Sequence, residues 1–156
     1  CFEEIDFSYH RAVLHGDFCF TNIFFDRKRN LVKIIDPLGV DPVLEGKCVH
    51  GDGRYDLAKL FHSAIGGYDE IISGRAHLDS GLQQNEITFE SFDTVMRHEA
   101  MLENFNVGGI KLVSREVAAI AVQLFISMLP LHADNSSRQN LLLANAYRIF
   151  SDWIDQ

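Results

Sequence analysis

The stretch Tyr55–Ile72 constrains the fold most strongly, because its apolar residues recur with the period of an α-helix. Spacing of this kind predicts a helix that buries one face in a core. The polar residues Lys59, His62 and Asp69 fall outside that face. The expected buried face consists of Leu57, Leu60, Phe61, Ala64, Ile65, Tyr68, Ile71 and Ile72.

Residues at the ends of this stretch indicate where the helix begins and where it is weakest. Asp52 precedes it and is expected to be its N-cap. Gly66-Gly67 costs the helix about 1 kcal/mol per glycine relative to alanine, so we expect a kink or a break there. The same periodicity predicts three more helices, over Thr94–Phe105, Arg115–Leu129 and Ser137–Ile154.

Short polar residues mark the expected N-termini of these three helices. Asp93 precedes the first and Ser114 precedes the second. Ser136 and Gln139 have the spacing of a capping box at the start of the third. The second helix is apolar nearly all round, which predicts that it is buried.

Two β-hairpins are predicted between the helices. Ile23–Phe25 and Leu31–Ile35 are β-prone runs joined by the polar turn Asp26–Asn30, where aspartate and asparagine favour a turn. A second pair joins Ala76–Leu82 to Glu86–Phe92. The elements together predict an α+β fold that is mainly helical and forms a single domain over residues 1–156.

Two segments near the start are expected to lack regular strands. Phe2–Arg11 predicts a short helix or an irregular lead-in. Pro37–Asp52 contains two prolines and three glycines, which predicts a long irregular loop. The chain begins with Cys1 rather than methionine, so we expect it to be a piece of a longer protein.

The composition excludes several classes of protein. A hydrophobic fraction of 47% argues against a disordered chain. The formal net charge of −8 argues against a nucleic-acid surface or an anionic membrane surface as the partner. No run of about 18 apolar residues indicates a membrane span. Three cysteines without CxxC spacing favour a reducing, cytoplasmic setting without a disulfide framework.

Three oxygen-bearing side chains near the first hairpin suggest a reactive site. Asn22 follows Asp17 by five residues, and Asp36 ends the apolar run of the returning strand. If the hairpin folds back, Asn22 and Asp36 can bind Mg²⁺, which prefers oxygen ligands. Asp17 can accept or orient a hydroxyl proton, and phosphoryl transfer requires these parts. The alternative is that Asp17 and Asn22 only cap turns.

Three motifs follow one another in the chain: His15-Gly16-Asp17 with Asn22, then Ile35-Asp36, then Asp56-Leu57-Ala58. This series resembles the aminoglycoside/choline phosphotransferase family, a branch of the protein-kinase-like fold. The surrounding sequence is similar to bacterial members associated with capsule or cell-surface sugar metabolism. The resemblance covers Val13–Ile72 and fits the later helices only in a general way.

The resemblance implies a role for each matched residue. Asp17 corresponds to the catalytic carboxylate that takes or orients the acceptor hydroxyl. Asn22 and Asp36 correspond to the ligands of Mg²⁺. His15 and Asp56 correspond to structural residues that support the catalytic loop, Asp56 through the loop backbone.

The implied fold is the carboxy-terminal lobe of a kinase-like enzyme, with a small hairpin that holds the catalytic and metal loops. The implied activity is transfer of the γ-phosphoryl group of ATP to a hydroxyl of a sugar, an aminoglycoside or a choline-like acceptor. The family's amino-terminal nucleotide-binding lobe has no counterpart in these 156 residues, so the chain alone is expected to bind ATP poorly. The alternative is a catalytically incomplete lobe that acts as a binding or scaffold module.

Three further residues are weaker candidates for contacts with the acceptor. Cys19 lies inside the catalytic loop, where packing is the simpler interpretation. Asp41 and Asp52 could extend an acidic rim toward a cationic acceptor, although a solvated loop is the simpler interpretation. The segment Phe18–Thr21 departs from the filling common in the family, which suggests a different acceptor surface.

Overall fold

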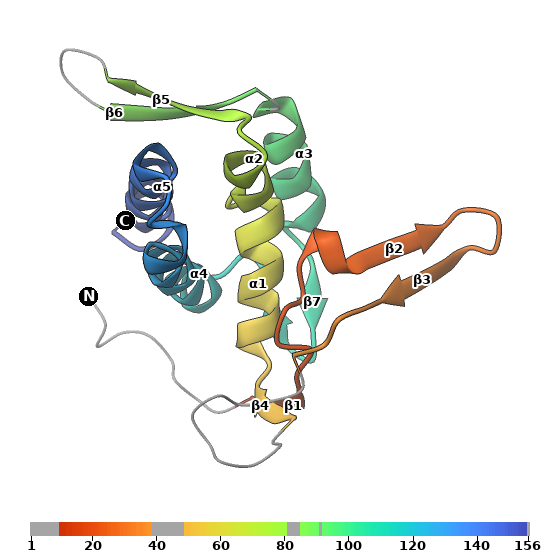
Figure 1. The fold of residues 1–156 in the computed structure, drawn as a ribbon. Helices are drawn as coiled ribbons and strands as arrows, with labels where there is room; N and C mark the ends of the chain where they lie inside the picture. Colours follow the sequence, from red (N-terminus) through yellow and green to blue (C-terminus); the bar gives the residue numbers. More distant parts are fainter. Residues whose placement is uncertain (1–9, 39–48, 81–84, 91, 156) are drawn as a thin grey trace.

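Residues 10–38, 49–80, 85–90 and 92–155 are described by the computed structural model, an α+β fold with about 48% helix (Figure 1). The α-helices are α1 (Arg54–Ala64), α2 (Tyr68–Ile72), α3 (Phe92–Leu102), α4 (Arg115–Met128) and α5 (Ser136–Trp153). The 3-10 helices are η2 (Phe20–Asn22) and η3 (Pro130–His132). The strands are β1 (Arg11–Val13), β2 (Ile23–Asp26), β3 (Leu31–Ile34), β4 (His50–Asp52), β5 (Ala76–Ser80), β6 (Asn85–Phe89), β7 (Asn106–Val107) and β8 (Ile110–Lys111).

The described strands pair only as antiparallel two-stranded ribbons: β1 with β4, β2 with β3, β5 with β6, and β7 with β8. Both predicted hairpins are confirmed, with Ile23 opposite Ile34 and Ala76 opposite Phe89. In the first turn, the Asp26 carboxylate accepts hydrogen bonds from two backbone N–H groups, and Asn30 adopts a left-handed φ of 50°. The predicted turn chemistry is therefore present.

The core is built around α1, which lies at the centre of the molecule (Figure 1). α1 packs against α4, and α4 packs against α5. Phe61, Phe125, Leu142 and Ile149 come from these three helices and are fully buried. Six of the eight residues predicted for the apolar face of Tyr55–Ile72 are buried in this core, and Tyr68 and Ile72 are half-buried.

The break at the end of α1 is confirmed and has a steric cause. Gly67 has a left-handed φ of 71°, which favours glycine. A Cβ on Gly66 would lie 2.9 Å from the Phe125 ring and 2.7 Å from the His62 carbonyl oxygen. The buried Asn145 amide donates a 2.6 Å hydrogen bond to the Gly66 carbonyl, so α5 supports this break.

The predicted helix caps are partly confirmed. The Ser114 side chain accepts a hydrogen bond from the Val117 N–H, as expected. Gly53 occupies the N-cap position of α1, although the Asp52 carboxylate still accepts from the Arg54 N–H. The capping box at the last helix was wrong, because Asn135 is the N-cap and accepts from the Arg138 N–H.

Two other residues that were expected to cap helices have different positions or contacts in the structure. Asp93 lies inside α3 instead of capping it. Gln139 donates its amide to the Leu129 carbonyl at 2.7 Å, so it joins the start of α5 to the end of α4. Asn135 and Ser136 are both residue types that favour the N-cap position. The local sequence therefore does not decide which of the two caps α5, and tertiary contacts do.

Strands occur where the sequence analysis expected irregular chain. β4 lies in the predicted loop Pro37–Asp52 and pairs with β1, which begins at the last residue of the predicted lead-in. Most of the rest of both segments, within residues 1–9 and 39–48, lies outside the described part of the chain. The hairpin β7–β8 was not predicted, although its Gly108-Gly109 turn has positive φ values of 61° and 87°. Glycine pairs with this geometry are typical of two-residue hairpin loops.

Lys59 and His62 were expected outside the buried face of α1, and this was wrong. Lys59 is 9% exposed and His62 is 2% exposed. The His62 ring lies 4.3 Å from the Tyr68 ring and 4.0 Å from the Phe125 ring, measured between centroids. α1 is therefore buried on more than one side, because the chain before it covers one face and α4 covers another.

His62 predicts a loss of stability in acid. Burial, and then the charge of Lys59, lower the pKa of His62 from 6.5 to about 3. The unfolded chain takes up this proton as the pH falls through 6.5, whereas the folded chain does not until about pH 3. The free energy of unfolding should therefore fall by about 1.4 kcal/mol per pH unit in this window. Urea unfolding of the wild type at a series of pH values measures the slope.

A variant isolates this contribution from those of other groups. His62→Phe retains a ring between Tyr68 and Phe125 and removes the titration, so its slope between these pH values should be flatter than that of the wild type. Equal slopes for the two proteins would show that His62 is not held neutral in the fold.

α4 is long and apolar enough, together with the residues up to His132, to span a membrane by length and composition alone. The window Arg115–His132 has a mean hydropathy of 1.2 and is 33% buried inside the structure. A core helix satisfies the same two conditions. α4 packs against both α1 and α5, but Ile126 on it is 49% exposed, so the predicted burial of this helix is only partly confirmed.

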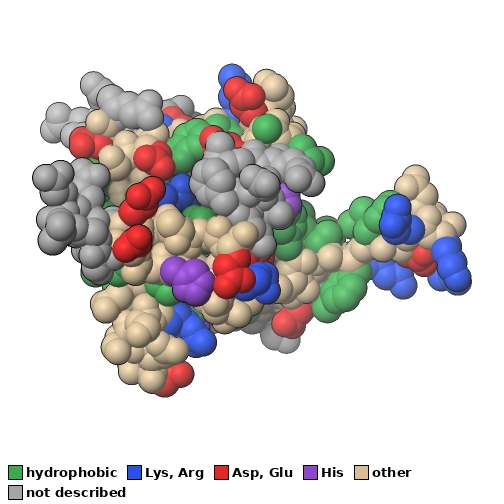
Figure 2. Space-filling model, turned by 90° about the horizontal axis from the view of Figure 1, so that it is seen from above, with side chains coloured by type: hydrophobic (Ala, Val, Ile, Leu, Met, Phe, Trp, Pro, Cys, Tyr) green, Lys and Arg blue, Asp and Glu red, His purple; other side chains and the backbone are tan. Residues whose placement is uncertain are grey.

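The hairpin β2–β3 projects from the body as an arm (Figure 1), and the arm is visible on the right of Figure 2. Its exposed hydrophobic side chains are Phe24, Phe25, Leu31, Val32 and Ile34. The turn at its tip contains Arg27, Lys28 and Arg29, in contrast to the overall acidic charge of the chain. The arm begins directly after η2, so it is covalently continuous with the loop that contains Asp17.

Candidate functional site

The loop between β1 and η2 is held to the first turn of α1 by Asp56. The Asp56 carboxylate accepts a 2.7 Å hydrogen bond from the His15 N–H and a 2.8 Å bond from the Gly16 N–H. Hydrogen bonds to an ionised carboxylate are stronger than bonds between neutral groups. The supporting role expected for Asp56 requires a contact of this kind with the loop backbone.

Gly16 allows the close approach that this loop requires. Its φ of 82° lies in the left-handed region, and a Cβ there would lie 3.0 Å from the Leu38 Cβ. The Leu38 N–H also donates to the His15 carbonyl at 2.9 Å. The chain that follows the hairpin is thus fastened beside the loop that precedes it.

Asp17 is held through both of its carboxylate oxygens. Lys59 Nζ lies 3.0 Å from Oδ1, and the Asn22 amide donates a 2.9 Å hydrogen bond to Oδ2. The same amide donates to the Asp17 carbonyl, also at 2.9 Å. The Asp17 side chain remains 34% exposed, so an incoming group can still reach it.

The His15 side chain joins the loop to the end of the hairpin. Nε2 lies 2.9 Å from the Ile35 carbonyl, and Nδ1 lies 3.3 Å from the Asp17 backbone nitrogen. A carbonyl only accepts and a backbone N–H only donates, so this arrangement requires the tautomer with hydrogen on Nε2. His15 therefore fixes the positions of both Asp17 and the residue before Asp36.

Asp36 follows this anchored position in an unusual backbone conformation. The Ile35 N–H donates to the Asn22 carbonyl at 3.0 Å, which places the end of the hairpin beside η2. Asp36 then has a left-handed φ of 58° and an exposed side chain. A non-glycine residue with such a φ costs free energy and often occurs at a functional site. The structure thus brings the backbone of Asp36 next to the loop of Asp17 and Asn22.

Two oxygen groups at this site are uncommitted within the described chain. The Asp36 carboxylate has no hydrogen-bond or ion-pair partner there, and the Asn22 Oδ1 accepts no bond because only Nδ2 is engaged. Both are hard oxygen donors of the kind that Mg²⁺ selects. No cluster of three or more His, Cys, Asp or Glu suited to a metal occurs among the described residues. Mg²⁺ needs no such cluster, because it is often bound by one or two protein oxygens together with substrate phosphates.

Of the three weaker acceptor candidates, Cys19 lies in the loop of Asp17, Asp52 lies at the start of α1, and Asp41 is not described. Cys19 Sγ lies 3.1 Å from Thr21 Oγ1 within the same loop. Asp52 pairs with Arg54 at 2.6 Å at the start of α1. Burial alone would raise the pKa of Asp52, but the hydrogen bonds and charge of Arg54 outweigh it and lower that pKa. Asp41 lies outside the described residues.

Two side chains of the site were missed by the sequence analysis. Lys59 contacts the Asp17 carboxylate, and the Ser63 hydroxyl accepts a 3.1 Å bond from the Phe20 N–H. The Ser63 hydroxyl donates in turn to the Asp69 carboxylate. Asp56, Lys59 and Ser63 are spaced by three and four residues, so they form one polar stripe along α1. That stripe was the signal available in the sequence.

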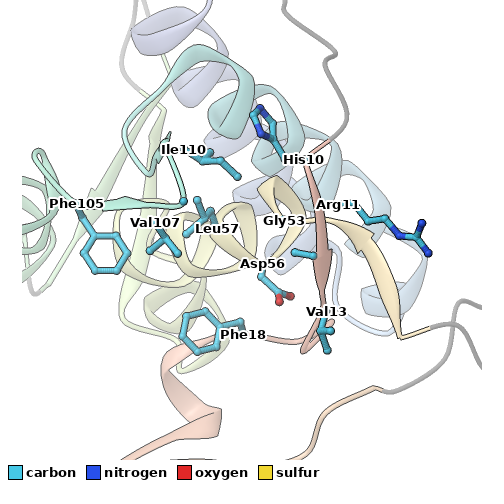
Figure 3. A pocket seen from close by; sticks show the side chains of 12 residues that line it. His10, Arg11, Val13, Phe18, Gly53, Asp56, Leu57, Phe105, Val107 and Ile110 are labelled. Carbon is cyan, nitrogen blue, oxygen red and sulfur yellow. The ribbon is translucent and has the colours of Figure 1, made fainter.

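A cavity of about 580 Å³ lies between β1, the first turn of α1 and the hairpin β7–β8 (Figure 3). It adjoins the loop that follows β1. Its wall is mainly apolar and includes Val13, Phe18, Leu57 and Ile110. Figure 3 shows the Arg11 side chain pointing away from the cavity. Asp17 is not among its lining residues, although the adjacent Phe18 and the supporting Asp56 are.

Comparison with known proteins gave no relative: no family model, curated protein or solved structure matches this chain.

Proposed function

We propose that this chain is the catalytic half of an ATP- and Mg²⁺-dependent phosphotransferase that acts on a hydroxyl of a small molecule. The observation that supports the proposal most is the way the Asp17 carboxylate is held and exposed. Its carboxylate is fixed at both oxygens by Lys59 and Asn22 yet stays one-third exposed, at 34%. A carboxylate that merely capped a turn would need neither a buried lysine nor an amide from five residues away.

The proposal also includes a more specific fold than α+β. The order of the loop, the hairpin and then a helix that begins near a supporting aspartate resembles the carboxy-terminal lobe of a protein-kinase-like enzyme. Asp56 at α1 binds the loop backbone, and His15 binds the end of the hairpin. These contacts would hold the catalytic loop and the metal loop at a constant separation, as phosphoryl transfer requires.

In the proposed reaction the acceptor hydroxyl approaches Asp17. The acceptor oxygen forms a bond to the γ-phosphorus of ATP, the bond between that phosphorus and the β,γ-bridging oxygen breaks, and ADP leaves. The hydroxyl proton passes to the Asp17 carboxylate, which acts as the general base. Asn22 Oδ1 and the Asp36 carboxylate would hold Mg²⁺, whose charge, when it is bound, offsets the charge on the phosphates.

The acceptor class follows from the resemblance: a sugar, an aminoglycoside or a choline-like alcohol. The second candidate function is a kinase-like lobe that binds a partner without catalysis. The observation that favours it is the lack of a glycine-rich phosphate loop in this sequence. The uncommitted oxygens of Asn22 and Asp36 favour the enzyme, because a scaffold has no chemical need for them.

The test is Mg²⁺-dependent turnover of ATP by the protein expressed from its full open reading frame. Phosphate transfer to a panel of sugars, choline and aminoglycosides is measured with labelled ATP, with ADP release as the second readout. We expect turnover that requires Mg²⁺, and Asp36→Asn should raise the Mg²⁺ concentration needed for half-maximal rate, because a neutral amide binds the cation more weakly.

Asp79→Asn, an exposed aspartate in the hairpin β5–β6, is the matched control and should leave the Mg²⁺ dependence unchanged. Absence of nucleotide binding and of turnover with every acceptor would contradict the enzyme and support the scaffold.

A further inference from the structure

Lys59 is a charged side chain among core residues of α1, and the burial of its ammonium group needs an explanation. It is 9% exposed, and its neighbours along α1, Ala58 and Leu60, belong to the core. Taking an ammonium group out of water is unfavourable, and replacing a buried ion pair with apolar side chains often leaves stability unchanged or raises it. Stability of the fold therefore does not explain a lysine at this position.

The contacts of Lys59 point to Asp17 instead. Nζ lies 3.0 Å from Asp17 Oδ1, which is within hydrogen-bonding distance for an ion pair. The stripe of α1 meets the loop at three successive places: Asp56 at the His15 and Gly16 N–H groups, Lys59 at the carboxylate, and Ser63 at the Phe20 N–H. Asp56 and Ser63 hold backbone, whereas Lys59 holds the side chain proposed to react.

The second oxygen of Asp17 is held independently of α1. Asn22 donates to Oδ2, and its own Oδ1 stays available for the proposed metal. A carboxylate rotates freely about its side-chain bonds in water, but two partners on different oxygens fix its plane. One partner belongs to the core helix and the other to the proposed metal site, so the plane of Asp17 is set by both.

We infer that Lys59 is the positioning residue for Asp17: it fixes the orientation of the base toward the acceptor hydroxyl, and a lysine ammonium at this site is required for full turnover. This inference rests on the proposed phosphotransferase function and adds a residue that the family motifs do not include. Lys59 acts through Asp17 and contributes no ligand to the metal. Its removal should therefore lower kcat and leave the KM for ATP unchanged.

The experiment uses the protein from the full open reading frame and four variants: Lys59→Met, Lys59→Arg, Lys59→Ala and Lys111→Met. Met retains the length of the side chain without the charge. Lys111 is exposed on β8 and serves as the matched control. We expect Lys59→Met to lower kcat by about 100-fold, the usual cost of a catalytic group misplaced by about 1 Å. The KM for ATP should not change, and Lys59→Arg should recover part of kcat because its guanidinium also binds a carboxylate.

Addition of a small amine separates positioning from folding. Lys59→Ala leaves a space beside a partly exposed carboxylate, so ethylammonium in the buffer should raise the kcat of this variant and leave that of Lys59→Met unchanged. A lysine needed only for folding would show no such rescue. The control Lys111→Met should retain the wild-type kcat and show no response to the amine.

The outcomes separate the inference from the function on which it rests. If the wild type turns over ATP and Lys59→Met retains its kcat, the inference is wrong and the phosphotransferase remains. If Lys59→Met loses kcat but the amine does not restore Lys59→Ala, Lys59 is structural and the inference is also wrong. If the wild type has no activity with water or any acceptor, both fail together.

Discussion

Replacing Asp17 with asparagine should lower kcat by about 100- to 10,000-fold, the range that general base catalysis contributes. The amide has the shape of the carboxylate but cannot accept the hydroxyl proton. The amide oxygen can still accept from Lys59, and Asn22 keeps its hydrogen bond to the backbone carbonyl of residue 17, so the loop should retain its position although the bond from Asn22 to the side chain is lost. The loss should therefore appear in kcat, with the KM for ATP nearly unchanged.

The measurement is steady-state ADP release with the best acceptor from the panel, on the protein from its full open reading frame. Asp134→Asn provides the control, because Asp134 is exposed in the connection that precedes α5. Circular dichroism and urea unfolding should show that both variants are folded. A kcat for Asp17→Asn close to that of Asp134→Asn would remove Asp17 from the role of base.

Replacing Phe61 with alanine should lower the free energy of unfolding by about 3–5 kcal/mol. Phe61 lies on α1 with no exposed surface, and its ring packs edge to face against Trp153 of α5 at 5.7 Å between centroids. The substitution removes the buried ring, leaves a cavity and loses the aromatic contact. Such a loss is a large part of the total stability of a domain of this size.

Urea unfolding followed by far-ultraviolet circular dichroism measures the change. Trp153 is the single tryptophan of the chain and supplies a second, fluorescent readout. Tyr147→Ala is the matched control, because Tyr147 lies on α5 and is 69% exposed. The control should change stability by less than about 0.5 kcal/mol. A similar effect in both variants would contradict the placement of Phe61 in the core.

Local patterns predicted the helices and two hairpins well because their signals are short-range. The period of apolar residues located α1, α4 and α5, and Ser114 gave the correct cap. Gly66-Gly67 gave the correct break, since a left-handed φ is a property of the residue itself. These predictions needed no information about what lies across the fold.

Tertiary contacts explain the predictions that failed. β1 and β4 are three residues long and far apart in the sequence, with Val13 opposite His50. No local sequence pattern marks strands that are so short and so distant from each other. The one-sided model of an amphipathic helix placed Lys59 and His62 in solvent, whereas α1 is covered on several sides. At the site, the motifs located Asp17, Asn22 and Asp56, but a motif names residues along the chain and could not show that Lys59 reaches Asp17.

The polar stripe on α1 has a consequence for heating. The loop with Asp17 is bonded to the helix that forms the centre of the core, through Asp56, Lys59 and Ser63. Release of this loop breaks several hydrogen bonds to a helix that is itself packed against α4, so we expect the loop to stay in place until α1 loosens. Thermal inactivation and the cooperative melting of the domain should thus be one event.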